Sequence, residues 1–273
     1  MFLRLRQLCL VAHELEPVVD ALCGVLGLQV CHRDPGVERF GLHNALMAVG
    51  SSFVEVVAPL LEGTAAGRHL ARLGGDGGYM VILDCDDIAP WQRHVDAIGV
   101  RVASLLQTPG YTGLQLHPRD TGGALLEINH TPGGDSLAGP YWPAGPHWQD
   151  LPPSADTLAI AGATLFSADP AALAGRWAQI LQRPAPPLNP SALNGFEMAL
   201  DNATHLRFLP GQEGDGNGYG KGLARIDLQV SDAAKILGRA KSRGCKTRQA
   251  GSKNPGVDSA AVSIGGIWWH FRN

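Results

Sequence analysis

The chain has 273 residues, of which 45% are hydrophobic and 17% are charged, and its net charge at pH 7 is −3. This composition is typical of a globular protein long enough for two domains, and it excludes an intrinsically disordered chain. The Lys and Arg residues are scattered, and the mild cluster from Arg239 to Arg248 is interpreted as a solvated helix end. We therefore expect no nucleic-acid partner.

The N-terminal segment predicts neither a signal peptide nor a membrane anchor, because Arg4 and Arg6 interrupt its apolar run and it contains no small-residue cleavage pattern. No apolar run reaches the roughly 18 residues that a membrane-spanning helix requires. The five cysteines form no CxxC pair, which indicates reduced packing residues rather than a disulfide framework or a zinc cluster. We expect a cytoplasmic protein that has no membrane partner.

The first half is predicted to contain two units, each of one strand, one helix and three strands. The first unit comprises a strand at 3–12, a helix at 15–26 that ends at Gly27, and strands at 29–32, 44–49 and 52–58. The second comprises a strand at 79–85, a helix at 88–98 that ends at Gly99, and strands at 101–105, 113–117 and 124–129. In the connection between them, Thr64 is predicted to cap a short helix at 65–73.

A Pro- and Gly-rich segment at 131–156 separates this half from a second pair of units. The third unit comprises a strand at 158–166, a helix at 170–181, and strands at 195–200 and 204–210; the fourth comprises a strand at 222–230, a helix at 232–243 and a strand at 266–271. Tyr141, Trp142, His147 and Trp148 of the separating segment either close over a site or attach the segment to both domains.

Glu127 lies in the apolar strand ALLEIN, where an ionised carboxylate would lose its water. Because an unpaired charge is costly there, the position predicts a metal, a cationic partner or a raised pKa. Two carboxylates sharing a proton, or neutralisation by Arg4, Arg6 or Arg119, are alternatives to the metal.

Pairs of positions, one in each opening strand and one in each closing strand, recur at nearly constant spacing. The separations, by subtraction of residue numbers, are 48, 47, 45 and 45 for Gln7 and Glu55, Met80 and Glu127, Gly162 and Arg207, and Arg225 and His270. This regularity predicts four copies of one βαβββ unit, paired two and two.

With these units, the chain resembles the vicinal oxygen chelate superfamily of glyoxalases, bleomycin-resistance proteins and extradiol dioxygenases. The segments that carry the resemblance are LRQLCLVAHELEPVVDALCGVLGL, FGLHNALMAVGSSFVEVVAP, GGYMVILDCDDI and LHPRDTGGALLEI. The resemblance implies an α+β fold of four βαβββ units, paired into two glyoxalase-like domains with curled mixed sheets. The predicted domains are 1–130 and a degenerate 157–273, with a linker at 131–156.

The resemblance also implies a divalent metal ion (Zn, Ni, Mn, Fe or Mg) in the cleft of the first domain. Its predicted ligands are the oxygen donors Gln7, Glu55 and Glu127. Met80 departs from the family pattern, since the family usually has His or another hard donor at that position. The inward-facing Asn44, together with Met80 and Arg119, is predicted to contact substrate.

The equivalent positions of the second half are Gly162, Arg207, Arg225 and His270, with His205 on the same strand face as Arg207. Two arginines and a histidine would not hold a divalent cation well; they either bind an anion or face solvent. The iron ligands of an extradiol dioxygenase would fall on Gly162, Arg225 and His270, so ring cleavage is the least favoured hypothesis.

We predict a glyoxalase-like, metal-dependent isomerase, epimerase or lyase that acts on a small oxygen-rich molecule, with Glu127 or Glu55 moving the proton. The alternative is a metal-free protein that sequesters a small molecule, in which Glu55 and Glu127 attract a cationic ligand or form salt bridges. In either case we expect a monomer or a homodimer.

Overall fold

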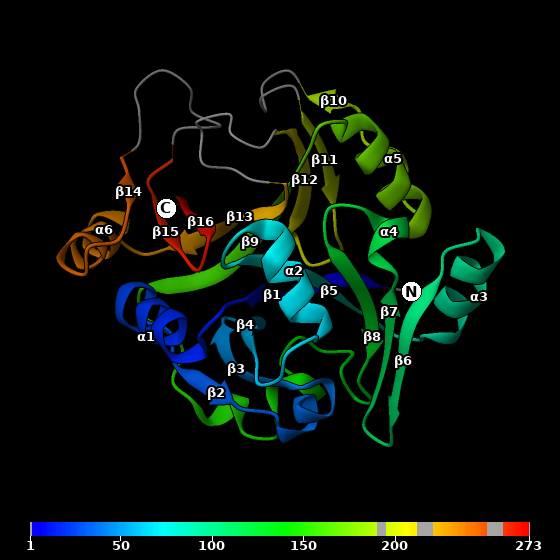
Figure 1. Cartoon of the computed structure of the whole chain (residues 1–273), viewed down its shortest axis with the longest axis horizontal. Helices are drawn as coiled ribbons and strands as arrows, with labels where there is room; N and C mark the ends of the chain where they lie inside the picture. The colour runs from blue at the N-terminus through cyan, green and yellow to red at the C-terminus, as the bar shows by residue number, and fades with distance from the viewer. Residues whose placement is uncertain (1, 190–194, 212–220, 250–258, 273) are drawn as a thin grey trace.

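The computed structural model describes residues 2–189, 195–211, 221–249 and 259–272, and its strands form two eight-stranded sheets (Figure 1). The strand order of the first sheet is β2-β3-β4-β1-β5-β8-β7-β6. Its strands are β1 (Leu3–Val11), β2 (Val30–His32), β3 (Leu42–Val49), β4 (Ser52–Pro59), β5 (Gly77–Cys85), β6 (Val102–Thr108), β7 (Tyr111–Leu116) and β8 (Leu125–His130). β1 pairs in parallel with β4 and antiparallel with β5, so the sheet is mixed and holds the first two units side by side.

The second sheet repeats this arrangement in the order β10-β11-β12-β9-β13-β16-β15-β14. Its strands are β9 (Thr157–Ser167), β10 (Leu188–Asn189), β11 (Gly195–Ala199), β12 (His205–Pro210), β13 (Gly222–Val230), β14 (Thr247–Arg248), β15 (Ala261–Ile264) and β16 (Ile267–Arg272). The predicted α+β fold of four βαβββ units in two glyoxalase-like sheets is confirmed. The sequence does not predict β10, β14 and β15, because strands of two to four residues are too short to show an alternating pattern.

The described α-helices begin and end close to their predicted residues, apart from the four-residue helix at 118–121, which is not predicted. They are α1 (Leu15–Leu26), α2 (Ala65–Leu73), α3 (Ala89–Ala97), α4 (Pro118–Thr121), α5 (Pro170–Ile180) and α6 (Ala233–Ser242). α1 ends where Gly27 adopts a φ of 72°, a conformation that favours glycine. As predicted, Thr64 caps α2 by accepting a hydrogen bond from the backbone N–H of Gly67. None of the helices in the described ranges has both the length and the apolar character needed to cross a membrane.

The strand register places the two glutamates of the first sheet at equivalent positions. Cys9 in β1 lies opposite Glu55 in β4, and Ile82 in β5 lies opposite Glu127 in β8. β1 and β5 pair antiparallel around this point, with Gln7 opposite Ile82. The two units are therefore related by a local twofold, as the spacing of these residues in the sequence predicts.

The two halves share one hydrophobic core. A single cluster of buried apolar residues includes Leu8 and Val81 of the first sheet and Ile226 of the second. The backbone N–H of Leu3 also donates to Asp201 Oδ2 at 2.7 Å, across the boundary between the halves. The length of the chain predicts a separate core for each half, but the cores merge because β5 packs against β13 and α1 against α6. The domain boundaries stay a prediction.

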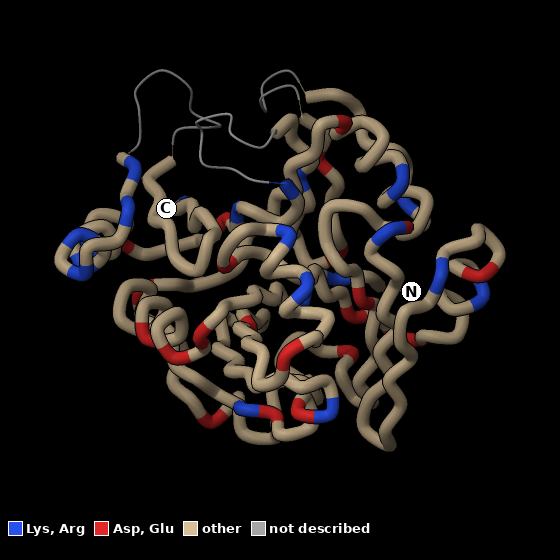
Figure 2. The backbone as a smooth tube through the Cα atoms, viewed as in Figure 1, with Lys and Arg blue, Asp and Glu red and all other residues tan. Residues whose placement is uncertain are grey.

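Charged residues of both signs are spread over the chain (Figure 2). The predicted basic cluster lies on α6 and β14. It is more than a solvated helix end, because Arg239 pairs with Asp156 of the segment between the sheets, and the Arg243 side chain packs on Gly24 of α1.

The close approach of β5 and β13 requires a glycine at residue 78. A Cβ at this position would lie 2.0 Å from the carbonyl oxygen of Leu223, and a backbone atom cannot swing aside. We therefore expect Gly78→Ala to lower the free energy of unfolding by about 2 kcal/mol, measured by urea denaturation. Gly75→Ala is the matched control, because a Cβ at residue 75 would meet nothing within 4 Å. Equal stability of the two variants would contradict the close packing of the halves.

Candidate functional site

The face of the first sheet that points away from the shared core carries Gln7, Glu55 and Glu127, and we call it the carboxylate face. The side chains of Leu8, Val54 and Leu126, next to these residues in the chain, belong to the shared core on the opposite side. Gln7, Glu55 and Glu127 are 2%, 7% and 3% exposed, so three polar groups are buried together here. Such groups require hydrogen-bond partners.

Neutral donors satisfy the Glu55 carboxylate. Gln7 Nε2 donates to Glu55 Oε2 at 2.8 Å, and Asn44 Nδ2 donates to Glu55 Oε1 at 2.7 Å. Asn44 is itself held in place, since its Oδ1 accepts the backbone N–H of Asp34 at 2.8 Å. Asn44, which is predicted to contact substrate, is thus a hydrogen-bond donor to the Glu55 carboxylate.

Glu127 also receives neutral donors, from the strands β7 and β8. Tyr111 donates its hydroxyl to Glu127 Oε1, and Gln115 Nε2 donates to Glu127 Oε2 at 2.8 Å. Asn129 Nδ2, two residues along the same strand, lies 3.3 Å from Glu127 Oε1. Three donors therefore replace the water that this carboxylate loses on folding.

Tyr141 joins the two glutamates into one hydrogen-bonded network. Its hydroxyl donates to Gln7 Oε1 at 3.0 Å and accepts from Asn129 Nδ2 at 3.3 Å. A continuous chain of hydrogen bonds consequently runs from Glu55 through Gln7, Tyr141 and Asn129 to Glu127.

Tyr141 reaches the network because the segment 131–156 lies over the carboxylate face. The Tyr141 ring stacks on Phe53 of β4 with centroids 4.9 Å apart, and the Trp148 ring meets Phe53 edge-on at 5.1 Å. Trp142, by contrast, is 51% exposed. Tyr141 and Trp148 therefore cover the carboxylate face, as the first of the two roles considered for these aromatic residues requires.

The arginines considered as neutralising partners bind elsewhere. Arg4 forms an ion pair with Asp84 at 2.5 Å. Arg6 Nη2 donates to the carbonyl of Leu137 at 2.9 Å, and its guanidinium lies 5.1 Å from the centre of the Tyr141 ring. Across the described residues, neither Glu55 nor Glu127 forms an ion pair, so neutralisation by Arg4 or Arg6 is not what stabilises them.

Arg119 and Met80 differ in their placement. Arg119 is exposed on α4 and contributes no hydrogen bond to the described network, while Met80 is buried at 7% exposure in a small apolar cluster with Cys9 and Ile82. Of the predicted substrate contacts, Asn44 and Met80 therefore lie at the carboxylate face and Arg119 lies at the surface.

The pKa values of both glutamates are raised. Burial raises the pKa of Glu55 above 4.5, against the hydrogen bonds from Asn44 and Cys9 that lower it, and the charge of Glu127 raises it further. Burial likewise raises the pKa of Glu127, against the hydrogen bonds from Tyr111 and its other donors. A raised pKa is one of the three outcomes that the buried position of Glu127 predicts.

The oxygen donors predicted to hold a metal do not fit one in this arrangement. Gln7 turns its nitrogen toward Glu55, and the oxygens of both glutamates face N–H or O–H groups. Met80 adds a thioether, a poor ligand for hard cations. Nowhere in the described ranges do three His, Cys, Asp or Glu side chains form a group that could hold a metal ion.

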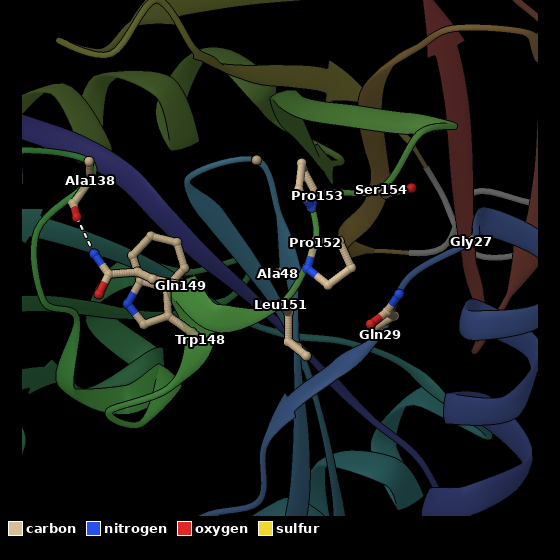
Figure 3. A pocket seen from close by; sticks show the side chains of 11 residues that line it. Gly27, Gln29, Ala48, Ala138, Trp148, Gln149, Leu151, Pro152, Pro153 and Ser154 are labelled. Atoms are coloured by element: carbon tan, nitrogen blue, oxygen red, sulfur yellow. Dashed lines mark hydrogen bonds between the residues drawn. The ribbon is translucent and has the colours of Figure 1, made fainter.

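A cavity of about 320 Å³ adjoins the covered face beside Trp148 (Figure 3). Its wall includes Ala48 of β3, Gln29 at the start of β2, and Leu151 and Pro152 of the covering segment. Ala48 lies opposite Phe53 in the sheet and Trp148 contacts Phe53, so the cavity lies next to the aromatic residues that cover the carboxylate network.

Several residues of the network are not predicted from the sequence. They are Cys9, Tyr111, Gln115, Asn129 and the bridging role of Tyr141. The available signal was the polar side chains at alternate positions of β7 and β8, where Gln115 lies opposite Glu127.

The fold and this site define a glyoxalase-like protein, and the comparison with known families agrees. The sequence model of a family described as a glyoxalase-like domain matches residues 8–181, so the chain belongs to this family. The predicted resemblance to the vicinal oxygen chelate superfamily is confirmed at this level. No curated protein sequence matches the chain.

Solved structures with a similar fold include a mutant of 4-hydroxymandelate synthase from Streptomyces coelicolor. It covers 99% of this chain and 92% of its own, with a TM-score of 0.69 and 11% identity, which shows a common two-sheet fold. A variant of methylmalonyl-CoA epimerase from Streptomyces coelicolor, in complex with 2-nitronate-propionyl-CoA, covers 48% of this chain and 99% of its own, with a TM-score of 0.44 and 22% identity. The methylmalonyl-CoA epimerase from Mycobacterium tuberculosis covers 47% and 87%, with a TM-score of 0.43 and 22% identity.

The Tyr141 hydroxyl is expected to stabilise the fold through the network. Tyr141→Phe keeps the ring on Phe53 but removes the donor to Gln7 and the acceptor for Asn129, so the free energy of unfolding should fall by about 1 to 2 kcal/mol in urea denaturation. The control Trp142→Phe, in the same segment and 51% exposed, should change it by no more than about 0.5 kcal/mol. Unchanged stability of Tyr141→Phe would show that the hydroxyl is not a bridge.

The raised pKa values of Glu55 and Glu127 predict a pH dependence of stability. Because each folded-state pKa lies above 4.5, the stabilisation from each group is complete below that pH and is lost as the pH rises through the folded pKa. Glu127→Gln cannot ionise, so its free energy of unfolding should rise relative to that of the wild type as the pH increases above 4.5. Glu16→Gln, at an exposed glutamate that pairs with Arg33, controls for the loss of one charge. Parallel pH profiles of Glu127→Gln and the wild type would refute this assignment.

Proposed function

We propose that the chain is an enzyme that moves a proton on a small oxygen-rich molecule, as isomerases and epimerases do, and that Glu55 and Glu127 are its acid–base pair. The observation that carries the proposal is the pair of buried carboxyl groups at twofold-related positions of one face. A carboxyl group whose pKa is raised toward neutrality is suited both to accept and to donate a proton near pH 7.

The hydrogen-bonded network supports a two-sided proton transfer. Glu55 and Glu127 come from different units and approach the face from opposite sides of the β1–β5 pair. One carboxylate removes a proton from a carbon next to a carbonyl group, and the other carboxyl group returns a proton from the opposite side. Gln7 and Asn44 hold Glu55 in position, while Gln115 and Asn129 hold Glu127.

The substrate contacts follow from the placement of the remaining residues. Asn44 and Met80 are proposed to contact the reacting part of the substrate, and Arg119, which is exposed, a part that reaches solvent. The cavity beside Trp148 is proposed as the route of entry, because Trp148 lines the cavity and also packs on Phe53 of the carboxylate face.

Metal-assisted chemistry is tested separately, because the donors of the carboxylate face are engaged with one another. Elemental analysis of protein purified without a chelator or a histidine tag is expected to show no stoichiometric Zn, Ni, Mn or Fe. A stoichiometric metal that disappears in Glu127→Gln would overturn the proposed metal-free proton transfer and restore the metal-assisted form.

Proton transfer predicts exchange of substrate hydrogen with solvent. Oxo acids, hydroxy acids and thioesters incubated with the protein in D₂O should include compounds that lose the signal of the C–H beside the carbonyl group in proton NMR. Glu55→Gln and Glu127→Gln should each slow this loss by about 100-fold or more, while Glu16→Gln should leave it unchanged. Exchange that persists at the wild-type rate in both variants would exclude the two glutamates as the pair.

A metal-free binding protein is the second candidate, and the closed carboxylate face favours it. Tyr141 and Trp148 fill the face, and every carboxylate oxygen on it has a neutral donor within the chain. A compound that binds at this face in calorimetry, with affinity lost in Asn44→Ala but without any C–H exchange, would support binding over catalysis.

A further inference from the structure

The second sheet has a polar face equivalent to the carboxylate face, and its charge is opposite. Thr164 of β9 lies between Arg207 of β12 and Arg225 of β13 as cross-strand partner of both. Two residues further along each strand, and on the same face, Gly162 of β9 lies opposite Asp227 of β13. We call this surface the arginine face, and its residues are His205, Arg207, Arg225, Asp227, His270 and Arg272 around Thr164.

The arginine face is built around one fully buried carboxylate. Asp227 is 0% exposed, and its Oδ1 accepts from Arg225 Nε at 2.8 Å. Its Oδ2 lies 2.9 Å from Arg207 Nη1, 3.2 Å from His205 Nε2 and 3.4 Å from Arg272 Nη2. The sequence does not predict the role of Asp227. Of the two alternatives predicted for this set of residues, anion binding or exposure to solvent, exposure does not apply to Arg225 and His270, which are only 3% and 1% exposed.

Positive charge is in excess on this face. The guanidinium groups of Arg207, Arg225 and Arg272 share two carboxylates, Asp227 and Glu197, where Glu197 Oε2 accepts from Arg207 Nε at 2.6 Å. Among the described residues of this cluster, three guanidinium groups therefore face two carboxylates, which is an excess of one positive group. Within a largely desolvated cluster such an excess favours the binding of an anion.

His270, another residue of the arginine face, has a lowered pKa. Burial and then the charge of Arg225 lower the pKa of His270 to about 3, so this ring is neutral. The neutral His270 ring therefore adds no positive charge to the arginine face.

Thr164 supplies a hydrogen-bonding group in the middle of the face. The residue is 0% exposed, and within the described ranges its Oγ1 has no hydrogen-bond partner. This buried hydroxyl, on a residue that the strand register places between two arginines, has its donor available for an oxygen ligand. Asp227, in contrast, is already surrounded by its own donors.

Exposure increases from the centre of the face toward Arg272. The side chain of Arg225 is 4% exposed, that of Arg207 is 13% exposed and that of Arg272 is 39% exposed. An anion approaching past Arg272 would meet Arg207 next and Thr164 last. Gly162 allows the His205 ring to lie against β9, because a Cβ at residue 162 would lie 2.4 Å from His205 Nε2.

We propose that the arginine face binds the carboxylate or phosphate group of a small organic anion, with Arg207 and Arg272 as charged partners and Thr164 Oγ1 as the neutral donor. This site is separate from the carboxylate face and does not depend on the function proposed for it. Planar guanidinium groups bind both kinds of oxyanion through paired hydrogen bonds.

Isothermal titration calorimetry with inorganic phosphate and, separately, with succinate tests the site in a buffer free of other oxyanions. The wild type should bind at least one of them with a Kd of about 1 mM or lower. Phosphate alone would assign the ligand group as a phosphate, and succinate alone would assign it as a carboxylate. The absence of binding by either would overturn the proposal.

Variants distinguish a built site from general attraction to positive charge. Arg207→Gln and the nearly isosteric Thr164→Val should each weaken binding about tenfold. Arg33→Gln, at an exposed arginine of the first half, should leave the affinity unchanged. Equal weakening by Arg33→Gln, or wild-type affinity in a folded Thr164→Val protein, would refute the site. Thr164→Val decides the outcome if circular dichroism shows that Arg207→Gln does not fold.

Discussion

The burial of two carboxyl groups without a counter-charge is the constraint on which the first half of this protein depends. Glu55 and Glu127 lose their water, and no described cation replaces it. Amide, hydroxyl and thiol groups from the surrounding strands supply the hydrogen bonds instead, which lowers the cost of burial, although burial still raises the pKa of both glutamates. Apolar residues at these two positions would be easier to bury, so their presence argues for chemistry rather than for stability.

This constraint explains why the segment between the two sheets is ordered over the first one. The side-chain nitrogen of Gln7 donates a hydrogen bond to Glu55, so the side-chain oxygen of Gln7 needs a donor from outside the sheet. Tyr141 provides that donor, and its ring gains apolar burial against Phe53. The segment 131–156 is rich in Pro and Gly and crosses the carboxylate face without pairing as a strand. The contacts of Tyr141 with Gln7 and Phe53 hold it there instead. The segment is therefore part of the site and not only a linker.

Sequence patterns predicted the fold and the two glutamates but not the network between them. The repeat spacing and the glycine at the end of α1 depend on local periodicity and backbone conformation, which one segment reveals by itself. The partners of Glu127 depend on which strands become neighbours, because Tyr111 and Gln115 lie on β7 and reach Glu127 only through the pairing of β7 with β8. Asp227 was missed for the same reason: its role follows from arginines on β12 and β16 that only the sheet brings together. The metal prediction rested on residue types, and the orientation of each donor is a property of the packed structure.

The two faces show what the repeated unit fixes and what it leaves variable. Equivalent positions of the two sheets hold Glu55 and Glu127 in one and Arg207 and His270 in the other, so the backbone determines where a side chain points but not its charge. Gly162 illustrates the limit of that freedom, since the His205 ring occupies the space a larger residue would need. The apolar sides of both sheets contribute to a single core. Selection on that core would therefore maintain both sheets together, while the polar faces could diverge to recognise ligands of different charge.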